Sequence, residues 1–194
     1  SFGDDHVLVE RYVTRPRHIE IQVFADTQGS CVYLFERDCS VQRRNQKVVE
    51  RAPAPYLAPA RRAELCEAAL RLARAVKYTH AGTVEFLMDA DSGEFYFIEV
   101  NPRIQVEHTV TEMVTGIDLV RSQLLVANGH RLHEAPTNIP AQDEIECRGV
   151  AMQCRVTTED PANGFVPDYG RLAAYRCGAG PPLCRDPCEE RYAR

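Results

Sequence analysis

Two glutamates interrupt a pair of otherwise apolar segments that the sequence predicts to form a β-hairpin. Glu85 lies in residues 82–89 and Glu99 in residues 94–101, and the turn between them reads Ala-Asp-Ser-Gly. Folding about residues 90–93 brings the two carboxylates to within about one position of direct register, where paired Cβ atoms are about 4.5–5.5 Å apart. Two like charges that close in a dry setting either share a proton or bind a cation.

Asn101 adds a neutral oxygen on the same face as Glu99. Two carboxylates and an amide are hard-oxygen ligands, the kind that Mg²⁺ or Mn²⁺ takes when phosphate oxygens complete the shell. Because both segments are apolar on both faces, we expect strands that are covered on two sides. The alternative is that one glutamate lies at a sheet edge in solvent and binds nothing.

A second set of polar side chains follows at once, in the run NPRIQVEH at residues 101–108. If the segment is extended, Arg103, Gln105 and Glu107 project to one side. The guanidinium fork of Arg103 suits a small planar anion, and Glu107 beside it suits a general base. The alternative is an ordinary surface salt bridge between Arg103 and Glu107.

The polar run QRRNQK at residues 42–47 also has two interpretations. It is either a solvated basic loop or a cationic wall for a polyphosphate held through metal by the carboxylates. The wider stretch of residues 40–51 is too polar for a core, and the prolines that follow it predict a linker. His18, on an expected strand, is on its own more often a structural histidine than a ligand contact.

These side chains must be positioned by a mixture of strands and helices. Alternating polarity predicts half-buried strands and a hairpin in the first third of the chain, and apolar stripes predict two helical regions. The expected strands are residues 7–13, 18–26, 31–38, 82–89, 94–101, 149–157 and 171–176, with the last two paired; the expected helices are residues 60–76 and 109–127, with Gly116 as a candidate interruption. Without strict alternation of strand and helix, this order favours an α+β fold with a largely antiparallel sheet.

Composition excludes several classes of protein. The 194 residues include 23 Lys and Arg against 28 Asp and Glu, a net charge of −5, which argues against a nucleic-acid binder that reads phosphates by bulk charge. No apolar run approaches the ~18 residues of a membrane span, and no signal peptide is visible. Since the chain starts at Ser1 in the middle of a pattern, we expect an internal fragment.

The eight cysteines are scattered and contain no C-x-x-C pair. This spacing predicts reduced, mostly structural thiols in a reducing compartment rather than a zinc site or a disulfide scaffold.

Four segments in this order resemble the biotin carboxylase domain, an ATP-grasp ligase of biotin-dependent carboxylases, and most closely its pyruvate carboxylase branch. They are VERYVTRPRHIEIQV (residues 9–23), ERDCSVQRRNQKVVERAPAP (36–55), GTVEFL with FYFIEVNPRIQVEHTVTEMVTGIDLV (82–87 and 95–120) and AMQCRVTTEDPANGFVPDYGRL (151–172). The resemblance covers roughly residues 5–178 and implies an ATP-grasp core of antiparallel sheet and packed helices.

The resemblance also implies a reaction, in which ATP and bicarbonate form carboxyphosphate and its CO₂ carboxylates a ring nitrogen of biotin. Its motif positions assign the metal ions, Mg²⁺ or Mn²⁺, to Glu85, Glu99 and Asn101. They assign bicarbonate to Lys47, Arg103, Gln105 and the backbone of Val106, with Glu107 as its base and Arg155 stabilising the enolate of biotin. Adenine would meet Glu10 and Val13, and His18 and Gln42 would lie near the nucleotide.

The resemblance predicts three regions: a partial ATP-grasp domain over residues 1–135, the start of the biotin carboxylase C-terminal subdomain over residues 136–178, and a divergent tail over residues 179–194. Asn45 stands where the family usually has His, and PPLCRDPCEERYAR at the end does not resemble the family. The glycine-rich loop and the lysines that grip the ATP phosphates are absent, so we expect the chain to be inactive alone.

The implied partners are bicarbonate, a biotinyl carrier domain outside this chain and the carboxyltransferase domain of a parent homo-oligomer; no nucleic acid or membrane is expected. The implied compartment is the cytoplasm, or the mitochondrial matrix in a eukaryote. Two alternatives remain: another ATP-grasp carboxylate ligase, or a non-catalytic truncated chain that associates with intact subunits.

Overall fold

The computed structural model describes residues 3, 6–169, 171 and 174. The chain divides into two compact units, Ser1–Arg155 and Val156–Arg194. The first unit contains the main sheet, the α-helices and every candidate site residue, and it extends past the boundary predicted at residue 135. In the second unit, β7 (Glu159–Asp160) and β8 (Val166–Pro167) pair on either side of a short 3₁₀ turn (Pro161–Asn163).

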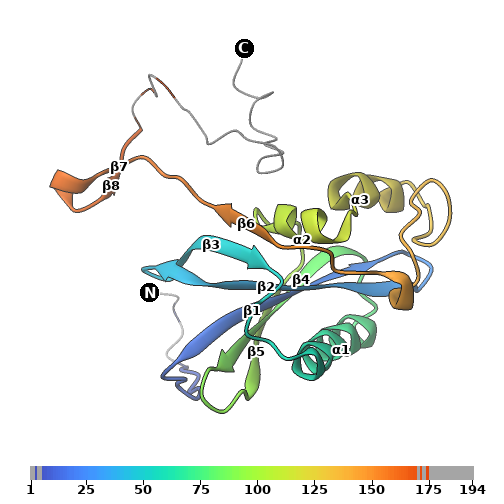
Figure 1. Cartoon of the computed structure of the whole chain (residues 1–194), viewed down its shortest axis with the longest axis horizontal. Helices are drawn as coiled ribbons and strands as arrows, with labels where there is room; N and C mark the ends of the chain where they lie inside the picture. The colour runs from blue at the N-terminus through green and yellow to red at the C-terminus, as the bar shows by residue number, and fades with distance from the viewer. Residues whose placement is uncertain (1–2, 4–5, 170, 172–173, 175–194) are drawn as a thin grey trace. The chain divides into compact units, whose positions relative to one another are not determined.

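Six strands of the first unit form one antiparallel sheet in the order β5-β4-β1-β2-β3-β6. Their bounds are β1 Pro16–Ala25, β2 Cys31–Arg43, β3 Gln46–Ala52, β4 His80–Asp89, β5 Phe95–Asn101 and β6 Ala151–Cys154. Helix α1 (Pro59–Ala75) covers one face, and α2 (His108–Thr115) and α3 (Leu119–Ala127) lie over the other (Figure 1). The predicted α+β class with an antiparallel sheet is confirmed.

Strand β1 is buried on both faces, so the prediction that it is half-buried is wrong. Ile19, Ile21 and Val23 pack against the core beneath α1. The intervening Glu20 and Gln22 are also fully buried, on the face toward α2. Alternating polarity ordinarily marks a strand with one wet face, but here the polar face is covered and its charges are paired within the protein.

The polar run at residues 40–51, expected to lie outside any core, is a β-hairpin. Strand β2 continues to Arg43, β3 starts at Gln46, and both intervening residues have positive φ, 51° at Arg44 and 62° at Asn45. This is the backbone pattern of a type I′ turn, which favours asparagine. The turn therefore gives a local structural reason for Asn at position 45.

Strand β5 lies at the edge of the sheet and is not covered on two sides as predicted. Phe97, Ile98 and Val100 are 52%, 39% and 40% exposed, whereas β4 beside it is buried along most of its length. The register nevertheless pairs Glu85 directly with Glu99, which confirms that the hairpin brings the two carboxylates face to face.

The second helical region is interrupted at Gly116, as the sequence predicts. Gly116 ends α2 with φ 72°, and Asp118 then caps α3 by accepting a hydrogen bond from the backbone N–H of Arg121 at 2.8 Å. Glycine takes the left-handed conformation at a helix end without a steric penalty. The interruption fixes where α2 ends, while Glu107 is the N-cap residue at its other end.

Other expectations are corrected or lie outside the described residues. Residues 7–13 form no strand. Strand β6 pairs with β3. Of the strand expected at residues 171–176, Arg171 and Ala174 alone are described and neither is in a strand; the others lie outside the described residues. The tail at residues 179–194 lies outside the described residues. Every described cysteine is a free thiol, and no helix of the described part has the length and apolar character needed to cross a membrane.

Candidate functional site

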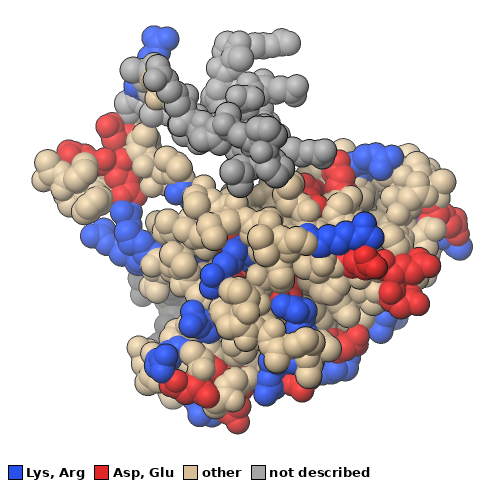
Figure 2. Space-filling model, in the orientation of Figure 1, with Lys and Arg blue, Asp and Glu red and all other residues tan. Residues whose placement is uncertain are grey.

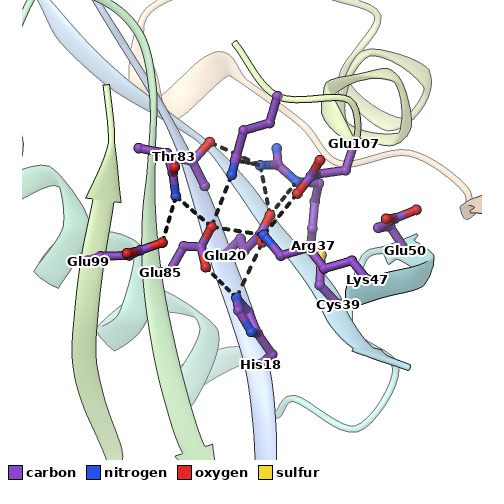
Figure 3. A network of polar contacts seen from close by, with 12 residues as sticks. His18, Glu20, Arg37, Cys39, Lys47, Glu50, Thr83, Glu85, Glu99 and Glu107 are labelled. Atoms are coloured by element: carbon purple, nitrogen blue, oxygen red, sulfur yellow. Dashed lines mark hydrogen bonds and ion pairs between the residues drawn. The ribbon is translucent and has the colours of Figure 1, made fainter. Parts of the chain in front are cut away.

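Charged side chains converge in one buried cluster on the face of the sheet toward α2 (Figure 3). This polar cluster consists of Glu20 on β1, Arg37 on β2, Lys47 on β3, Glu85 on β4 and Glu107 at the start of α2. Its carboxylates are at most 3% exposed. Charges so buried persist only when each is paired and hydrogen-bonded.

Arg37 is the central cation of the polar cluster and is 0% exposed. Its guanidinium donates hydrogen bonds of 2.7–3.3 Å to the side chains of Glu20, Gln22, Thr83, Gln105 and Thr111. A rigid planar fork can satisfy several acceptors at once. Arg37 thereby ties β1, β2 and β4 to α2.

Lys47 is shared among three carboxylates. Its Nζ donates to Glu85 Oε1 at 2.9 Å and to Glu107 Oε1 at 3.0 Å, and it is ion-paired with Glu20. Burial alone would lower the pKa of Lys47, but these carboxylates, Glu20 foremost, raise it above its usual range. Lys47 is therefore a fixed positive charge between Glu85, a predicted metal ligand, and Glu107, the predicted base.

His18 and Gln42, which the resemblance assigns to the nucleotide, contact each other at the edge of the polar cluster. The Nε2 atom of His18 lies 2.6 Å from Glu85 Oε2, and its Nδ1 atom lies 3.0 Å from Gln42 Nε2. Burial alone would lower the pKa of His18, but hydrogen bonds to Glu20 and Glu85 raise it to about 9. Nε2 of His18 faces the Glu85 carboxylate, and this contact favours a proton on that nitrogen.

Glu20 and Arg37 were missed by the sequence analysis. Burial alone would raise the pKa of Glu20, yet His18, Arg37 and Lys47 hold that pKa far below its usual range. Glu20 is therefore an anion with a cation on several sides. The only sequence signal was a glutamate between two isoleucines, and the same pattern is typical of a solvent-facing position.

Glu85, Glu99 and Asn101 lie together, and the two carboxylates fit a cation-binding role. The Nδ2 group of Asn101 donates to Glu85 Oε1 at 2.8 Å and to Glu99 Oε1 at 3.2 Å, so the amide lies between the two carboxylates. The side chain of Glu99 is exposed and that of Glu85 is buried. One open and one fixed carboxylate suit a divalent cation that arrives with phosphate oxygens and keeps part of its shell outside the protein.

Ligating atoms of His18, Glu20 and Glu85 also lie within 4.8 Å of one another, close enough to hold a metal ion. Lys47 is already ion-paired with both of these carboxylates, and its charge compensates them. The hairpin pair shares Glu85 with this group, but its second carboxylate, Glu99, is exposed and is not paired with Lys47, so it is the better cation site of the two.

Glu107 contacts Arg155, which the resemblance assigns to biotin. The Nη2 group of Arg155 donates to Glu107 Oε2 at 2.8 Å, and its Nε group donates to Glu50 Oε1 at 2.6 Å. Burial raises the pKa of Glu50, and Arg155 opposes that shift. The alternative that Glu107 merely pairs with Arg103 at the surface is wrong, since Glu107 is 2% exposed and pairs with Lys47 and Arg155.

Gln105 joins the polar cluster, accepting from Arg37 at 3.3 Å and donating to Glu85 at 3.0 Å. Arg103 does not join it: this side chain is exposed and donates to the backbone oxygen of Ile104 at 3.2 Å. Val106 is 60% exposed. The structure therefore separates the predicted bicarbonate residues into a fixed pair, Lys47 and Gln105, and an open pair.

Glu10 and Val13, assigned to adenine, lie apart from this arrangement. Glu10 is exposed and Val13 is 8% exposed, and among the described residues neither has a hydrogen bond or ion pair to the polar cluster. Their role remains a prediction.

The profile of the family described as "Carbamoyl-phosphate synthase L chain, ATP binding domain" matches residues 1–135. The chain belongs to this family. Among curated relatives it is 59% identical over 180 residues to pyruvate carboxylase of Bacillus subtilis (strain 168), which covers 93% of the chain and 16% of the relative. It is 51% identical over 180 residues to human "Pyruvate carboxylase, mitochondrial", with 93% and 15% covered. The chain thus spans a small part of the length of these relatives.

Solved structures of pyruvate carboxylase and of a related biotin carboxylase domain have a similar fold. A complete pyruvate carboxylase of Rhizobium etli superposes with a TM-score of 0.84 at 58% identity, covering 91% of this chain and 18% of that one. The biotin carboxylase domain dimer of Hydrogenobacter thermophilus 2-oxoglutarate carboxylase, in complex with MgADP, ADP and bicarbonate, gives 0.80 at 44% identity, covering 88% and 36%. The predicted fold, the ATP-grasp core of a biotin carboxylase, is confirmed.

Proposed function

We propose that this chain is part of a ligase that carboxylates biotin with bicarbonate and ATP, the first half-reaction of a pyruvate-carboxylase-like enzyme. The observation that carries the proposal is Glu107, a buried carboxylate held between the cations Lys47 and Arg155. This geometry supports a role for Glu107 as a base, with Lys47 beside it for bicarbonate and Arg155 for the carboxyl acceptor. The similarity to pyruvate carboxylases supports the same reaction.

In this proposal the protein groups have separate tasks. Lys47 and Gln105 hold the bicarbonate anion, Glu107 removes its proton, and the oxygen left behind attacks the terminal phosphorus of ATP with loss of ADP. The carboxyphosphate releases CO₂ and inorganic phosphate; the phosphate takes the proton of the biotin ring nitrogen, and that nitrogen forms a bond to CO₂. Arg155, beside Glu107, holds the negative charge that develops on the carboxyl acceptor. Arg103 and Val106 are placed to complete the bicarbonate site from its open side.

Glu85, Glu99 and Asn101 would hold the divalent cation, Mg²⁺ or Mn²⁺, on which ATP is bound. The cation would neutralise phosphate charge during transfer. His18 and its neighbour Gln42 would contribute further polar contacts on the nucleotide side, and Glu10 and Val13 would contact adenine. The Hydrogenobacter relative contains MgADP and bicarbonate, which supports separate sites for the metal nucleotide and for bicarbonate.

The remaining partners are proposed from the relatives. They are a biotinyl carrier domain, a carboxyltransferase domain that passes the carboxyl group to pyruvate, and further copies in a homo-oligomer. We place the protein in the cytoplasm, or in the mitochondrial matrix if the source is eukaryotic, as the name of the human relative supports.

The test is the ATPase and carboxylase activity of the full-length protein that contains this chain. We expect ADP release that depends on bicarbonate, and ATP-dependent carboxylation of free biotin. ADP release that depends on a different carboxylate substrate, with no carboxylation of biotin, would instead identify another ATP-grasp ligase and overturn the proposal.

A further inference from the structure

Glu50 is a buried carboxylate to which the proposed reaction gives no role. It lies on β3, in register with Gln153 of β6, and is 0% exposed. Figure 3 shows Glu50 beside the polar cluster, on the same strand as Lys47. A buried carboxylate needs a positively charged or hydrogen-bonding partner. The one strong contact of Glu50 therefore points to what this residue does.

That contact is with Arg155. Oxygen Oε1 of Glu50 accepts from Arg155 Nε at 2.6 Å, while Oε2 is buried and has no hydrogen-bond partner among the described residues. The backbone N–H of Arg155 donates to the carbonyl of Val48 at 2.9 Å, which fixes the base of the side chain beside β3. Glu50 thus binds the Nε group of Arg155 and no other side chain among the described residues.

The second carboxylate bound to this guanidinium is Glu107, which accepts from Nη2 at 2.8 Å. An arginine facing one carboxylate tends to form two parallel hydrogen bonds with it. Without Glu50, the Nε edge of Arg155 would be free to turn toward Glu107. A bidentate pair would hold Glu107 more tightly in its ionised form and weaken it as a base, and it would rotate the fork away from the carboxyl acceptor.

We propose that Glu50 is a positioning residue that limits the contact between Arg155 and Glu107 to a single hydrogen bond. By holding Nε, Glu50 keeps Glu107 available as a base and leaves Nη1 of Arg155 for the carboxyl acceptor. The inference rests on the proposed function, because it is there that Glu107 and Arg155 act on substrate.

The test is a double-mutant cycle in the full-length carboxylase, with the variants Glu50→Gln, Arg155→Gln and their combination. The matched control is Glu146→Gln, which removes the charge of an exposed glutamate paired with Arg148. We expect Glu50→Gln to lower kcat for biotin carboxylation about 10- to 100-fold with KM for ATP unchanged. In the Arg155→Gln background the same change should cost less than about twofold.

Losses that multiply in the double variant would show that Glu50 acts independently of Arg155 and would overturn the proposal. So would a kcat for Glu50→Gln within about threefold of the parent. If Glu50→Gln fails to fold, Glu50→Asp, which keeps the charge but withdraws it by one methylene, takes its place in the cycle with the same expected non-additivity. A parent enzyme that shows no bicarbonate-dependent ATP cleavage would refute the proposed function itself, whereas an active parent insensitive to Glu50 would refute the positioning role alone.

Discussion

The two faces of β1 are equally buried but are held by different interactions. Toward α1, Ile21 packs among aliphatic and aromatic side chains, where burial is non-directional and depends on volume. Toward α2, Glu20 is fixed by Arg37 and Lys47 through directed charge pairs. The first face tolerates a small change of shape, while the second requires every partner, because one missing cation leaves a buried anion uncompensated.

Charges on the outer surface differ from both faces. Figure 2 shows acidic and basic side chains interspersed over the face in view. Exposed pairs such as Arg148–Glu146 contribute about 0–1 kcal/mol each because water screens them. Removing a surface charge should therefore change the stability of the protein little, whereas removing a charge of the polar cluster should lower it strongly.

The largest expected effect is that of removing the central cation. Arg37→Met keeps much of the side-chain volume but leaves Glu20 and its neighbours without a guanidinium, and we expect it to lower the free energy of unfolding by about 3–5 kcal/mol. Urea denaturation of the chain measures this, with Arg148→Met as the exposed control. A loss below about 1 kcal/mol would show that the two faces of β1 do not differ as described.

An intermediate effect is expected at Glu99, which shares the cation site with Glu85 but is exposed. In the full-length enzyme, Glu99→Gln should raise the Mg²⁺ concentration for half-maximal ATP cleavage by at least about tenfold, or about 1.4 kcal/mol, because a charged ligand is lost. The free energy of unfolding should barely change. The control is Glu94→Gln, just before β5. An unchanged Mg²⁺ dependence would exclude the hairpin as the cation site.

The smallest expected effect is on the apolar face. Ile21→Val removes one methylene from a fully buried side chain and should lower the free energy of unfolding by about 0.5–1.5 kcal/mol. Because Ile21 points away from the polar cluster, KM for ATP in the full-length enzyme should be unchanged. A marked rise in that KM would mean that the two faces are coupled through the strand.

Local patterns predicted those parts of the molecule that local interactions decide. The turn at residues 90–93 sets the register of the hairpin, so Glu85 and Glu99 could be placed opposite each other from the sequence. Gly116 could be predicted as the helix break for the same reason. The family resemblance added His18, Gln42 and Arg155, whose partners are distant in sequence, and the structure brings all three to the polar cluster or its edge.

Long-range burial could not be predicted in the same way. Glu20 alternates with isoleucines just as it would on a solvent-facing strand, and its partners Arg37 and Lys47 come from other strands. The opposite error occurred at β5, whose apolar residues predicted cover on two sides although the strand lies at the sheet edge. In both cases the pattern gives the period of the strand, but tertiary contacts decide which face meets water.

The role of Glu107 as a general base is tested most directly by replacing it with glutamine. Glu107→Gln keeps the shape and removes the proton acceptor, while Glu146→Gln serves as the exposed control. At saturating bicarbonate, the rate of biotin carboxylation by the full-length enzyme should fall by about 10²–10⁴-fold with ATP affinity near that of the parent. A rate within about threefold of the parent would exclude Glu107 as the base and leave it as a structural partner of Lys47 and Arg155.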